Sequence, residues 1–300
     1  MKSILSLTLY VFVATVALAQ SKTDQLILFN EVREVVVEEV GNNFIKYKFP
    51  NENASYTISK HLVEKIIFSS GREETFESSF KPVKSVADYS NVYISYIPQD
   101  VEGLKSLGPV FSKAVGVTTL SSINNVNNRA VRKVKIEAAM MGANVVFVGN
   151  VFQRGNQYGN ENIPGNATMT SISGTAYLSK PNFDLGEAKQ RLQSLEFVLF
   201  QRDKLNRNAF DKSSEIAMMH DEKMRPKTFM FREVNETEGE LFVKTDKIKS
   251  KTGRLKVIFM DENMLTLMER HGNAIYNYIL LSENEPRVKT LKKLASNTTN

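Results

Sequence analysis

The sequence contains no cysteine. Disulfide bonds, thiol catalysis and cysteine-ligated zinc or iron–sulfur centres are therefore excluded, as is a lipidated cysteine after a leader. Histidine is scarce too: the chain has three, His61, His220 and His271, and no two of them have the spacing of paired metal ligands. We therefore expect neither a metal site nor a cofactor.

Recognisable catalytic motifs are missing as well. The chain has no Gly-x-Ser-x-Gly nucleophile elbow and no His-Glu-x-x-His zinc motif. No helix is expected directly after Gly149, Gly155 or Gly159, so these glycines do not form a phosphate-binding loop. No pair of carboxylates stands out for glycoside chemistry. The sequence therefore indicates a protein without catalytic residues, and a hydrolase with a site assembled only in space is the enzymatic alternative.

The chain has one long apolar run, at its N-terminus. Lys2 precedes a run from Ile4 to Leu18, and Ala17 and Ala19 supply the small residues that a signal peptidase reads. The run is about 15 residues long, short of the roughly 20 needed to cross a bilayer core. We therefore predict a signal peptide over residues 1–19 and no transmembrane segment after its cleavage. The expected location is periplasmic or extracellular, and an uncleaved membrane anchor is the alternative.

The net charge argues against nucleic acid as a partner. The formal charge is +6 at pH 7, and both signs are mixed along the chain. One cationic cluster consists of Lys244, Lys247, Lys249, Lys251, Arg254 and Lys256. It suits either contact with an anionic glycan or lipid headgroup, or a charged edge strand that discourages aggregation.

Short alternating and β-branched segments dominate the mature chain, and turn residues separate them. We predict an α+β, modular fold in which two small antiparallel β units flank a small α/β unit. The polar residues 80–90, with Pro82, indicate a linker. The predicted division is a signal peptide at 1–19, a small β domain at 22–78, an α/β domain at 90–179, an antiparallel β meander or barrel at 195–283 and a flexible tail at 284–300.

The clearest helix is predicted over residues 124–141. Its apolar face consists of Val126, Ala130, Val131, Val134, Ala138 and Met141. The candidate caps are Asn124, Asn125 and Asn127, and we expect Arg129, Arg132, Lys133 and Lys135 to project mostly away from the apolar face. Gly142 ends the helix. The apolar residues 145–152 then predict a strand that is buried on both faces.

Two segments resemble known bacterial families. Residues 24–76, with the patterns "VEEVGNNFIKYK" and "VEKIIFSSG", resemble a small β domain common in exported bacterial proteins of unknown function. The stretch "EAAMMGANVV" at residues 137–146 resembles the "GAN" signature of small α/β domains. These include the envelope-stress sensor lipoprotein of the Rcs system and a family named as putative heavy-metal-binding. The resemblances imply a fold and an export context, and they bring no catalytic residues.

Residues 153–174 form a segment rich in glycine and asparagine inside the α/β domain. Long irregular loops are uncommon in compact domains and are often functional or disordered. Amides with one aromatic ring could hydrogen-bond to and stack on a sugar, and a flexible polar loop is the other interpretation. The candidate ligand- or partner-binding residues are Arg154, Asn156, Gln157, Tyr158 and Asn160.

These observations favour an exported, non-enzymatic interaction or sensing protein of the bacterial envelope. Its expected partner is an envelope protein or a glycan. The alternative is a carrier that holds a small apolar ligand or a lipid in the C-terminal β domain. In that case the apolar side chains of the strands at residues 254–280 would line a cavity, whereas in the first case they fill a core.

Overall fold

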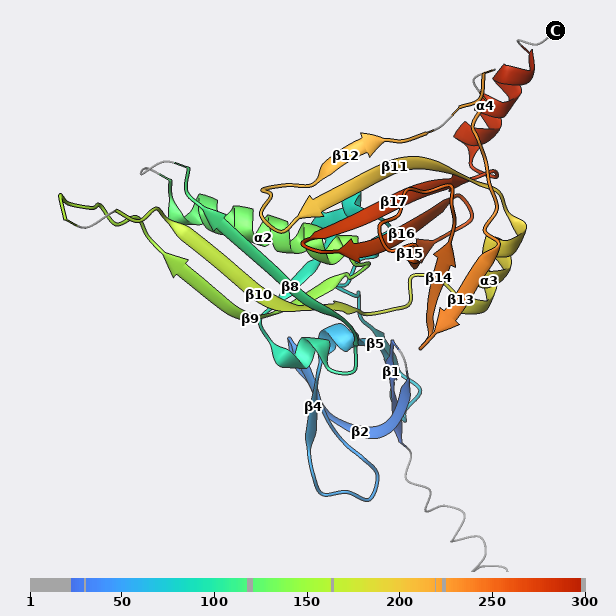
Figure 1. The fold of residues 1–300 in the computed structure, drawn as a ribbon. Coiled ribbons are helices and arrows are strands. Elements are labelled where there is room, and N and C mark those ends of the chain that lie inside the picture. The colour runs from blue at the N-terminus through green and yellow to red at the C-terminus, as the bar shows by residue number, and fades with distance from the viewer. Residues whose placement is uncertain are drawn as a thin grey trace, which may run out of the picture. The chain divides into compact units, whose positions relative to one another are not determined.

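The protein is built mainly from strands, many of which are labelled in Figure 1. The computed structural model describes residues 23–29, 31–117, 121–162, 165–218, 220–222 and 225–297, so the predicted signal peptide lies outside the described residues. Strands make up 45% of the structure and helices 19%, in three sheets that are almost entirely antiparallel. The predicted α+β, modular, β-rich fold class is confirmed.

The chain divides into two compact units, residues 1–79 and residues 80–300. The predicted α/β and C-terminal β domains therefore lie within one compact unit of the structure.

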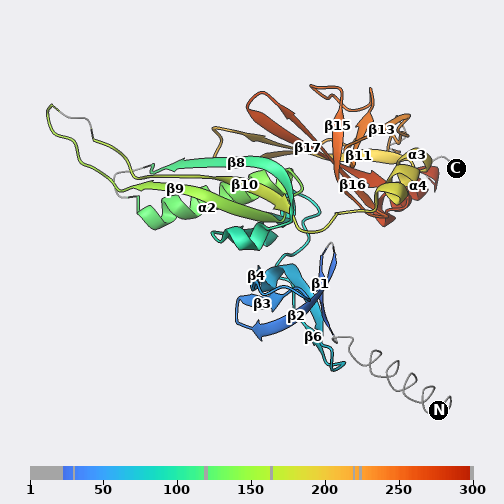
Figure 2. The ribbon, with the colours of Figure 1, turned by 90° about the horizontal axis from the view of Figure 1, so that it is seen from below.

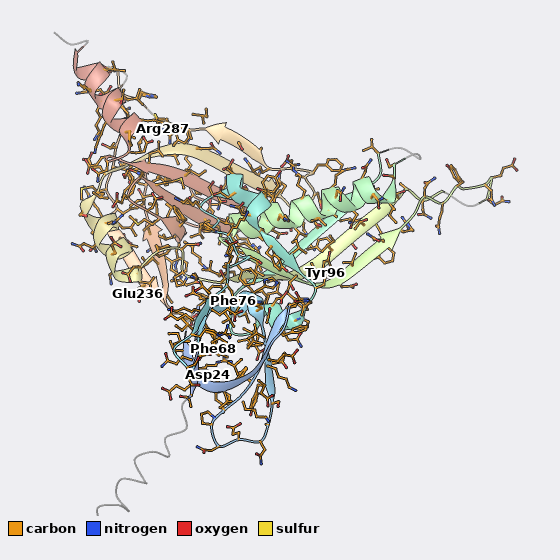
Figure 3. The ribbon with its side chains drawn as sticks, turned by 180° about the vertical axis from the view of Figure 1, so that it is seen from behind. Asp24, Phe68, Phe76, Tyr96, Glu236 and Arg287 are labelled. Carbon is orange, nitrogen blue, oxygen red and sulfur yellow. The ribbon has the colours of Figure 1, made fainter. Side chains whose placement is uncertain are left out.

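The first unit is a single antiparallel sheet in the order β4-β3-β2-β1-β5-β6. Its elements are β1 (Asp24–Leu28), β2 (Val32–Val40), β3 (Phe44–Lys48), β4 (Tyr56–Ser59), η1 (Lys60–Leu62), β5 (Val63–Ile67) and β6 (Glu73–Thr75). Alternation places Leu26, Val35 and Ile45 in its core. The carboxylate of Asp24, labelled in Figure 3, accepts hydrogen bonds from the backbone N–H of Val37 and Ser69.

The second unit begins with a four-stranded sheet in the order β7-β9-β10-β8, in which only the β7–β9 pair is parallel. Its elements are η2 (Val86–Asn91), β7 (Tyr93–Ser95), η3 (Pro98–Val101), β8 (Lys105–Val115), α2 (Ile123–Met140), β9 (Val145–Arg154) and β10 (Met169–Leu178). Figure 2 shows α2 lying along one face of this sheet. The N-cap of α2 is Ser122, which accepts from Asn125 N–H, so the predicted asparagine caps were wrong.

The glycine corner after α2 follows the local sequence. Gly142 adopts φ +82°, a left-handed conformation that favours glycine. Ala138 and Ala139 are fully buried, which brings helix and sheet close together. Asn144 accepts from Ser179 N–H at 3.0 Å and donates to Ser179 Oγ at 2.8 Å. The end of the helix at Gly142 agrees with the sequence prediction.

Two local expectations in this region were wrong. Residues 80–90 are no free linker, because Phe80, Val83 and Val86 are buried and η2 packs against α2. β9 is buried on both faces only in its first half, since residues 149–153 are exposed.

The rest of the second unit is a seven-stranded sheet in the order β12-β11-β17-β16-β15-β14-β13. Its elements are α3 (Leu185–Ser194), β11 (Phe197–Asn206), β12 (Ser213–Ile216), β13 (Glu233–Thr237), β14 (Glu240–Lys244), β15 (Leu255–Met260), β16 (Met264–His271), β17 (Ala274–Ser282) and α4 (Pro286–Asn297). Phe197 of β11 and Phe229, which precedes β13, exchange backbone hydrogen bonds at 2.8 Å. Because β11 and β13 lie near opposite borders of the sheet, this contact means that the sheet curls. Leu192 of α3 is buried with the inner-face residues Leu241, Leu265 and Leu280, so this core is filled.

Helix α2 is covered on both sides. Leu205 of β11 and Ile275 of β17 belong to the same buried cluster as Val134 and Ile136 of α2. The side chain of Asn182 bridges the two layers, since Nδ2 donates to the carbonyls of Gly142 and Ile258. The two sheets of the second unit therefore share a core through one helix.

The C-terminal segment also differs from the expected flexible tail. Residues 286–297 form α4, and Val288 is fully buried against Val198 and Leu281. The carboxylate of Glu285 holds the first turn by accepting from the N–H and Nε of Arg287, labelled in Figure 3.

Candidate functional site

Of the five residues predicted to bind a ligand, Arg154 lies in β9 and the other four lie in the segment that connects β9 to β10. Arg154 ends β9, and Gln157 pairs with Asn166 through two backbone hydrogen bonds of 2.8 Å. The side chain of Tyr158 is 78% exposed, and Asn160 is exposed as well. Asn156 is half-buried. Among the described residues, the buried atoms Arg154 Nε and Asn156 Nδ2 have no hydrogen-bond partner. None of the five residues lines the cationic cleft or the larger cavity of the second unit.

A cavity with a charged lining lies between α2, the outer edge of β8 and the β16–β17 turn. Its volume is about 260 Å³. We name it the cationic cleft, and its lining consists of Pro109, Val110, Phe111, Lys133, Glu137, Leu205, Arg207, Arg270, Gly272, Asn273, Ala274 and Ile275.

Two charged side chains of α2 enter the cationic cleft from the same helix face. Lys133 and Glu137 are four residues apart, which places them one turn from each other. Lys133 is only 4% exposed, and its Nζ donates to the backbone carbonyl of Arg207. Glu137 accepts from Phe111 N–H at 3.0 Å. The expectation that Lys133 projects away from the packed helix face was wrong, because the second sheet covers that side of α2.

Two arginines complete the lining from the second sheet. Arg270, near the end of β16, lies 3.6 Å from a Glu137 carboxylate oxygen through Nη2. Arg207 follows β11 and is held in place by a backbone hydrogen bond of 2.8 Å to the carbonyl of Asn273. Its guanidinium group lies over the ring of Phe111, 5.4 Å from the ring centre. Three cationic side chains and one carboxylate thus converge on one hollow.

Burial changes the protonation behaviour of both α2 groups. Burial raises the pKa of Glu137 above its usual range, although the Phe111 N–H and the cations Arg270, Lys133 and Arg207 oppose the change. Burial lowers the pKa of Lys133; the carboxylate of Glu137 opposes this change and Arg207 adds to it. Perturbed acids and bases in a concave site are typical of functional sites. The cleft can therefore bind an anion with a strength that depends on pH.

A larger cavity of about 920 Å³ lies beside the curled sheet, in the domain that the carrier alternative concerns. Its lining includes Phe229, Met230 and Phe231 together with charged residues. Four of these charged residues form two ion pairs: Lys244 lies 3.3 Å from Glu233, and Lys247 lies 3.0 Å from Asp246.

Three cations of the cluster at residues 244–256 are paired with carboxylates, namely Lys244, Lys247 and Lys256. Lys256 lies 2.6 Å from Glu240, and Lys247 lies 3.0 Å from Asp246. Arg254 stacks over the ring of Phe242 at 3.7 Å. These partners fit the interpretation of the cluster as a charged strand edge.

The cationic cleft was not among the sites predicted from the sequence. Arg207, Arg270 and Lys133 come from three elements that are far apart in the sequence. A weak signal was present in α2, since Lys133 and Glu137 flank the apolar positions Val134 and Ile136. Buried residues that encircle a helix indicate two packed faces, and a charged pair between them is then enclosed.

The chain matches no protein-family model, no curated protein and no solved structure. What defines it is a β-rich α+β fold with a cationic cleft in its second unit. Within the described ranges, no helix is both long enough and apolar enough to span a membrane. The same residues include no cluster of three or more histidine and acidic side chains that could hold a metal ion.

Proposed function

We propose that this chain is an exported, non-enzymatic binding or sensing protein of a bacterial envelope, and that it takes up a small anion in the cationic cleft. The observation that carries the proposal is the composition of the cleft. Three cations, Lys133, Arg207 and Arg270, face one carboxylate, Glu137, around a single cavity. Three positive charges against one negative charge leave an excess of two positive charges when all four groups are ionised.

The size of the cleft limits the ligand. A cavity of about 260 Å³ suits an anion of a few non-hydrogen atoms, or the acidic end of a longer molecule. Guanidinium groups bind carboxylate, phosphate and sulfate groups with two parallel hydrogen bonds. The acidic group of an envelope glycan offers this chemistry, which agrees with the glycan partner expected from the sequence.

Titration calorimetry with sulfate and with succinate tests the proposal on the mature chain. We expect saturable binding of one or both anions, weakened about tenfold or more in Arg207→Gln and in Arg270→Gln because each loses a charged hydrogen-bond donor. Arg72→Gln is the matched control, since it removes the same charge from the first unit. Absence of binding by the wild-type chain, or equal loss in the control, would refute the anion site.

The export part of the proposal rests on the leader-like segment before Gln20 and has its own test. We expect N-terminal sequencing of protein recovered from the envelope or medium to begin at Gln20. Recovery of the chain from the cytosol with Met1–Ala19 attached would refute export and leave the anion site untouched.

The carrier function remains a second candidate because of the 920 Å³ cavity and its aromatic side chains Phe229 and Phe231. An organic extract of purified protein that contains lipid in stoichiometric amount supports it. An extract without lipid counts against it, since a carrier is expected to retain part of its cargo.

A further inference from the structure

One sheet edge in the second unit is long and unpaired. β9 borders the four-stranded sheet, and β7 pairs with it only from Val145 to Phe147. Beyond Phe147, no described strand lies outside β9, and Figure 1 shows this part at the border of the sheet. The unpaired stretch, Val148–Arg154, is named the β9 edge below. Unpaired strand edges are templates for pairing with another chain.

The opposite border of the same sheet is protected. β8 carries Pro109, which offers no N–H group. Glu137 of α2 accepts the outward N–H of Phe111 at 3.0 Å, and Arg129 donates to the carbonyl of Val115 at 3.2 Å. These features block the addition of a strand to β8.

The borders of the seven-stranded sheet are protected in other ways. β12, at one border, is four residues long. β13, at the other border, carries the exposed acids Glu233 and Glu236, and Glu236 is labelled in Figure 3. Short strands and exposed charges are the usual means of keeping a sheet edge from pairing. The β9 edge is seven residues long, and its only charged residue, Arg154, is half-buried.

The register shows which backbone groups of the β9 edge are free. Phe111 N–H points out of the sheet, so by alternation Ser112 directs its backbone groups inward, to Ile172 of β10. Ile172 lies opposite Val151 on its other side. The backbone groups of Val151 therefore point out of the sheet, away from β10. Gln153, two residues on, has the same orientation.

We infer that the β9 edge pairs antiparallel with the same edge of a second copy of this chain, so that the two four-stranded sheets join into one. With a two-fold axis at Val151, the outward groups of each copy meet each other. Asn150 then lies opposite Phe152, and Arg154 lies opposite Val148 of the second copy. No charged residue faces a like charge, which is the condition for self-pairing.

The side chains of the β9 edge also suit an interface between copies. Val151 is 38% exposed and Phe152 is 49% exposed, on opposite faces of the strand. Pairing across the axis places Val151 opposite Val151 of the second copy on one face of the joined sheet. On the other face it places Phe152 opposite Asn150 of the second copy. A self-complementary patch of this kind is the basis of a two-fold dimer.

Sedimentation equilibrium of the mature chain over a range of concentrations tests the inference. We expect a monomer–dimer equilibrium in the wild-type chain and a monomer in Val151→Pro. Proline at this position removes an outward N–H and leaves the β9–β10 ladder intact. Lys113→Pro is the matched control, because Lys113 holds the equivalent outward position on β8. It should dimerise as the wild type does, and circular dichroism checks that both variants fold.

A wild-type chain that stays monomeric at its highest soluble concentration overturns the inference. So does a dimer that persists in folded Val151→Pro. Recovery of a monomer with a stoichiometric foreign peptide, lost in Val151→Pro, also overturns it by assigning the edge to a different partner.

Discussion

Asn277 of β17 donates a hydrogen bond from Nδ2 to the backbone carbonyl of Met140 at 2.9 Å, which links the second sheet to the end of α2. Asn277 is fully buried, and its Oδ1 has no hydrogen-bond partner among the described residues. The last carbonyls of a helix lack partners within the helix. A residue 137 positions away in the sequence supplies one here.

Replacing Asn277 by alanine should therefore weaken the whole second unit. The change leaves the Met140 carbonyl buried without its donor and opens a small cavity. We expect a loss of about 2 kcal/mol in the free energy of unfolding, measured by urea denaturation. Asn235→Ala, at an exposed position of β13, should change it by less than about 0.5 kcal/mol.

The number of transitions in the same denaturation curves tests whether the two sheets of the second unit share one core. Because α2 shares a core with both sheets, residues 80–300 should unfold in one transition that moves as a whole in Asn277→Ala. Two separate transitions for the two sheets, with only one moved by the substitution, would contradict a shared core.

A second prediction concerns the contact between Gly142 and Ile258. A Cβ added to Gly142 would lie 3.0 Å from Ile258 Cβ, whereas one added to Gly103 would meet nothing within 4 Å. Both glycines have positive φ, +82° and +73°. Gly103→Ala should thus cost about 1 kcal/mol from backbone strain. Gly142→Ala should cost about 1–3 kcal/mol more from overpacking.

Thermal and urea denaturation of both glycine variants measures the difference. Equal losses of unfolding free energy in the two variants would mean that Gly142 does not approach Ile258 of β15 as closely as it does in the structure.

The sequence predicted those features that depend on nearby residues. The end of the helix at Gly142 follows from the local backbone conformation, whereas Asn144 binds Ser179, which is 35 residues away. The strands within residues 254–280 were predicted from local signals as well, namely alternation and turn residues.

The cationic cleft and the packing of residues 80–90 depend on distant partners. Lys133 is buried because β11 and β17 cover a second side of α2, and no local pattern identifies these strands as its neighbours. Val83 and Val86 were assigned to a linker because the segment is short and polar around Pro82. Their burial against α2 is a tertiary effect that overrides the local signal.

A third prediction concerns Glu269, a buried carboxylate that holds the loop after β14. It accepts from Ser250 Oγ at 2.8 Å, from the N–H groups of Lys251 and Thr252, and from Tyr278 OH at 2.6 Å. Glu269→Gln places an amide among these donors and should cost about 2 kcal/mol of unfolding free energy. Glu236→Gln, at an exposed position, is the control.

The pH dependence of stability gives a separate test of this network. Burial alone would raise the pKa of Glu269, but the hydrogen bonds from Tyr278, Lys251, Thr252 and Ser250 lower it below its usual range. A lowered pKa in the folded state stabilises the fold above the unfolded-state value of about 4.3, and this share is lost as the pH falls through the folded-state pKa. The acid-induced loss of stability should therefore be smaller in Glu269→Gln. If the unfolding free energy of Glu269→Gln depends on pH as that of the wild type does, the lowered pKa of Glu269 does not contribute to the acid-induced loss of stability.

The last prediction concerns the pH dependence of anion binding. Burial raises the pKa of Glu137, which faces Arg270, Lys133, Arg207 and the Phe111 N–H. As the pH falls through that raised pKa, the carboxylate becomes neutral and the cleft gains positive charge. Sulfate, which keeps its charge over this range, should therefore bind more tightly at lower pH. Burial lowers the pKa of Lys133, so binding should weaken when this amine loses its proton at high pH.

The variant Glu137→Gln separates the change in sulfate affinity at low pH, assigned to Glu137, from the change at high pH, assigned to Lys133. The amide oxygen can still accept from Phe111 N–H, so the fold should be retained. Because the raised pKa of Glu137 stabilises the fold only below that pKa, the variant should not lose stability at neutral pH. Its sulfate affinity at neutral pH should rise about tenfold, as expected for removal of one nearby negative charge. The increase in sulfate affinity at low pH should disappear, whereas the decrease at high pH should remain. If sulfate affinity in Glu137→Gln still rises as the pH falls, another group controls the charge of the cleft.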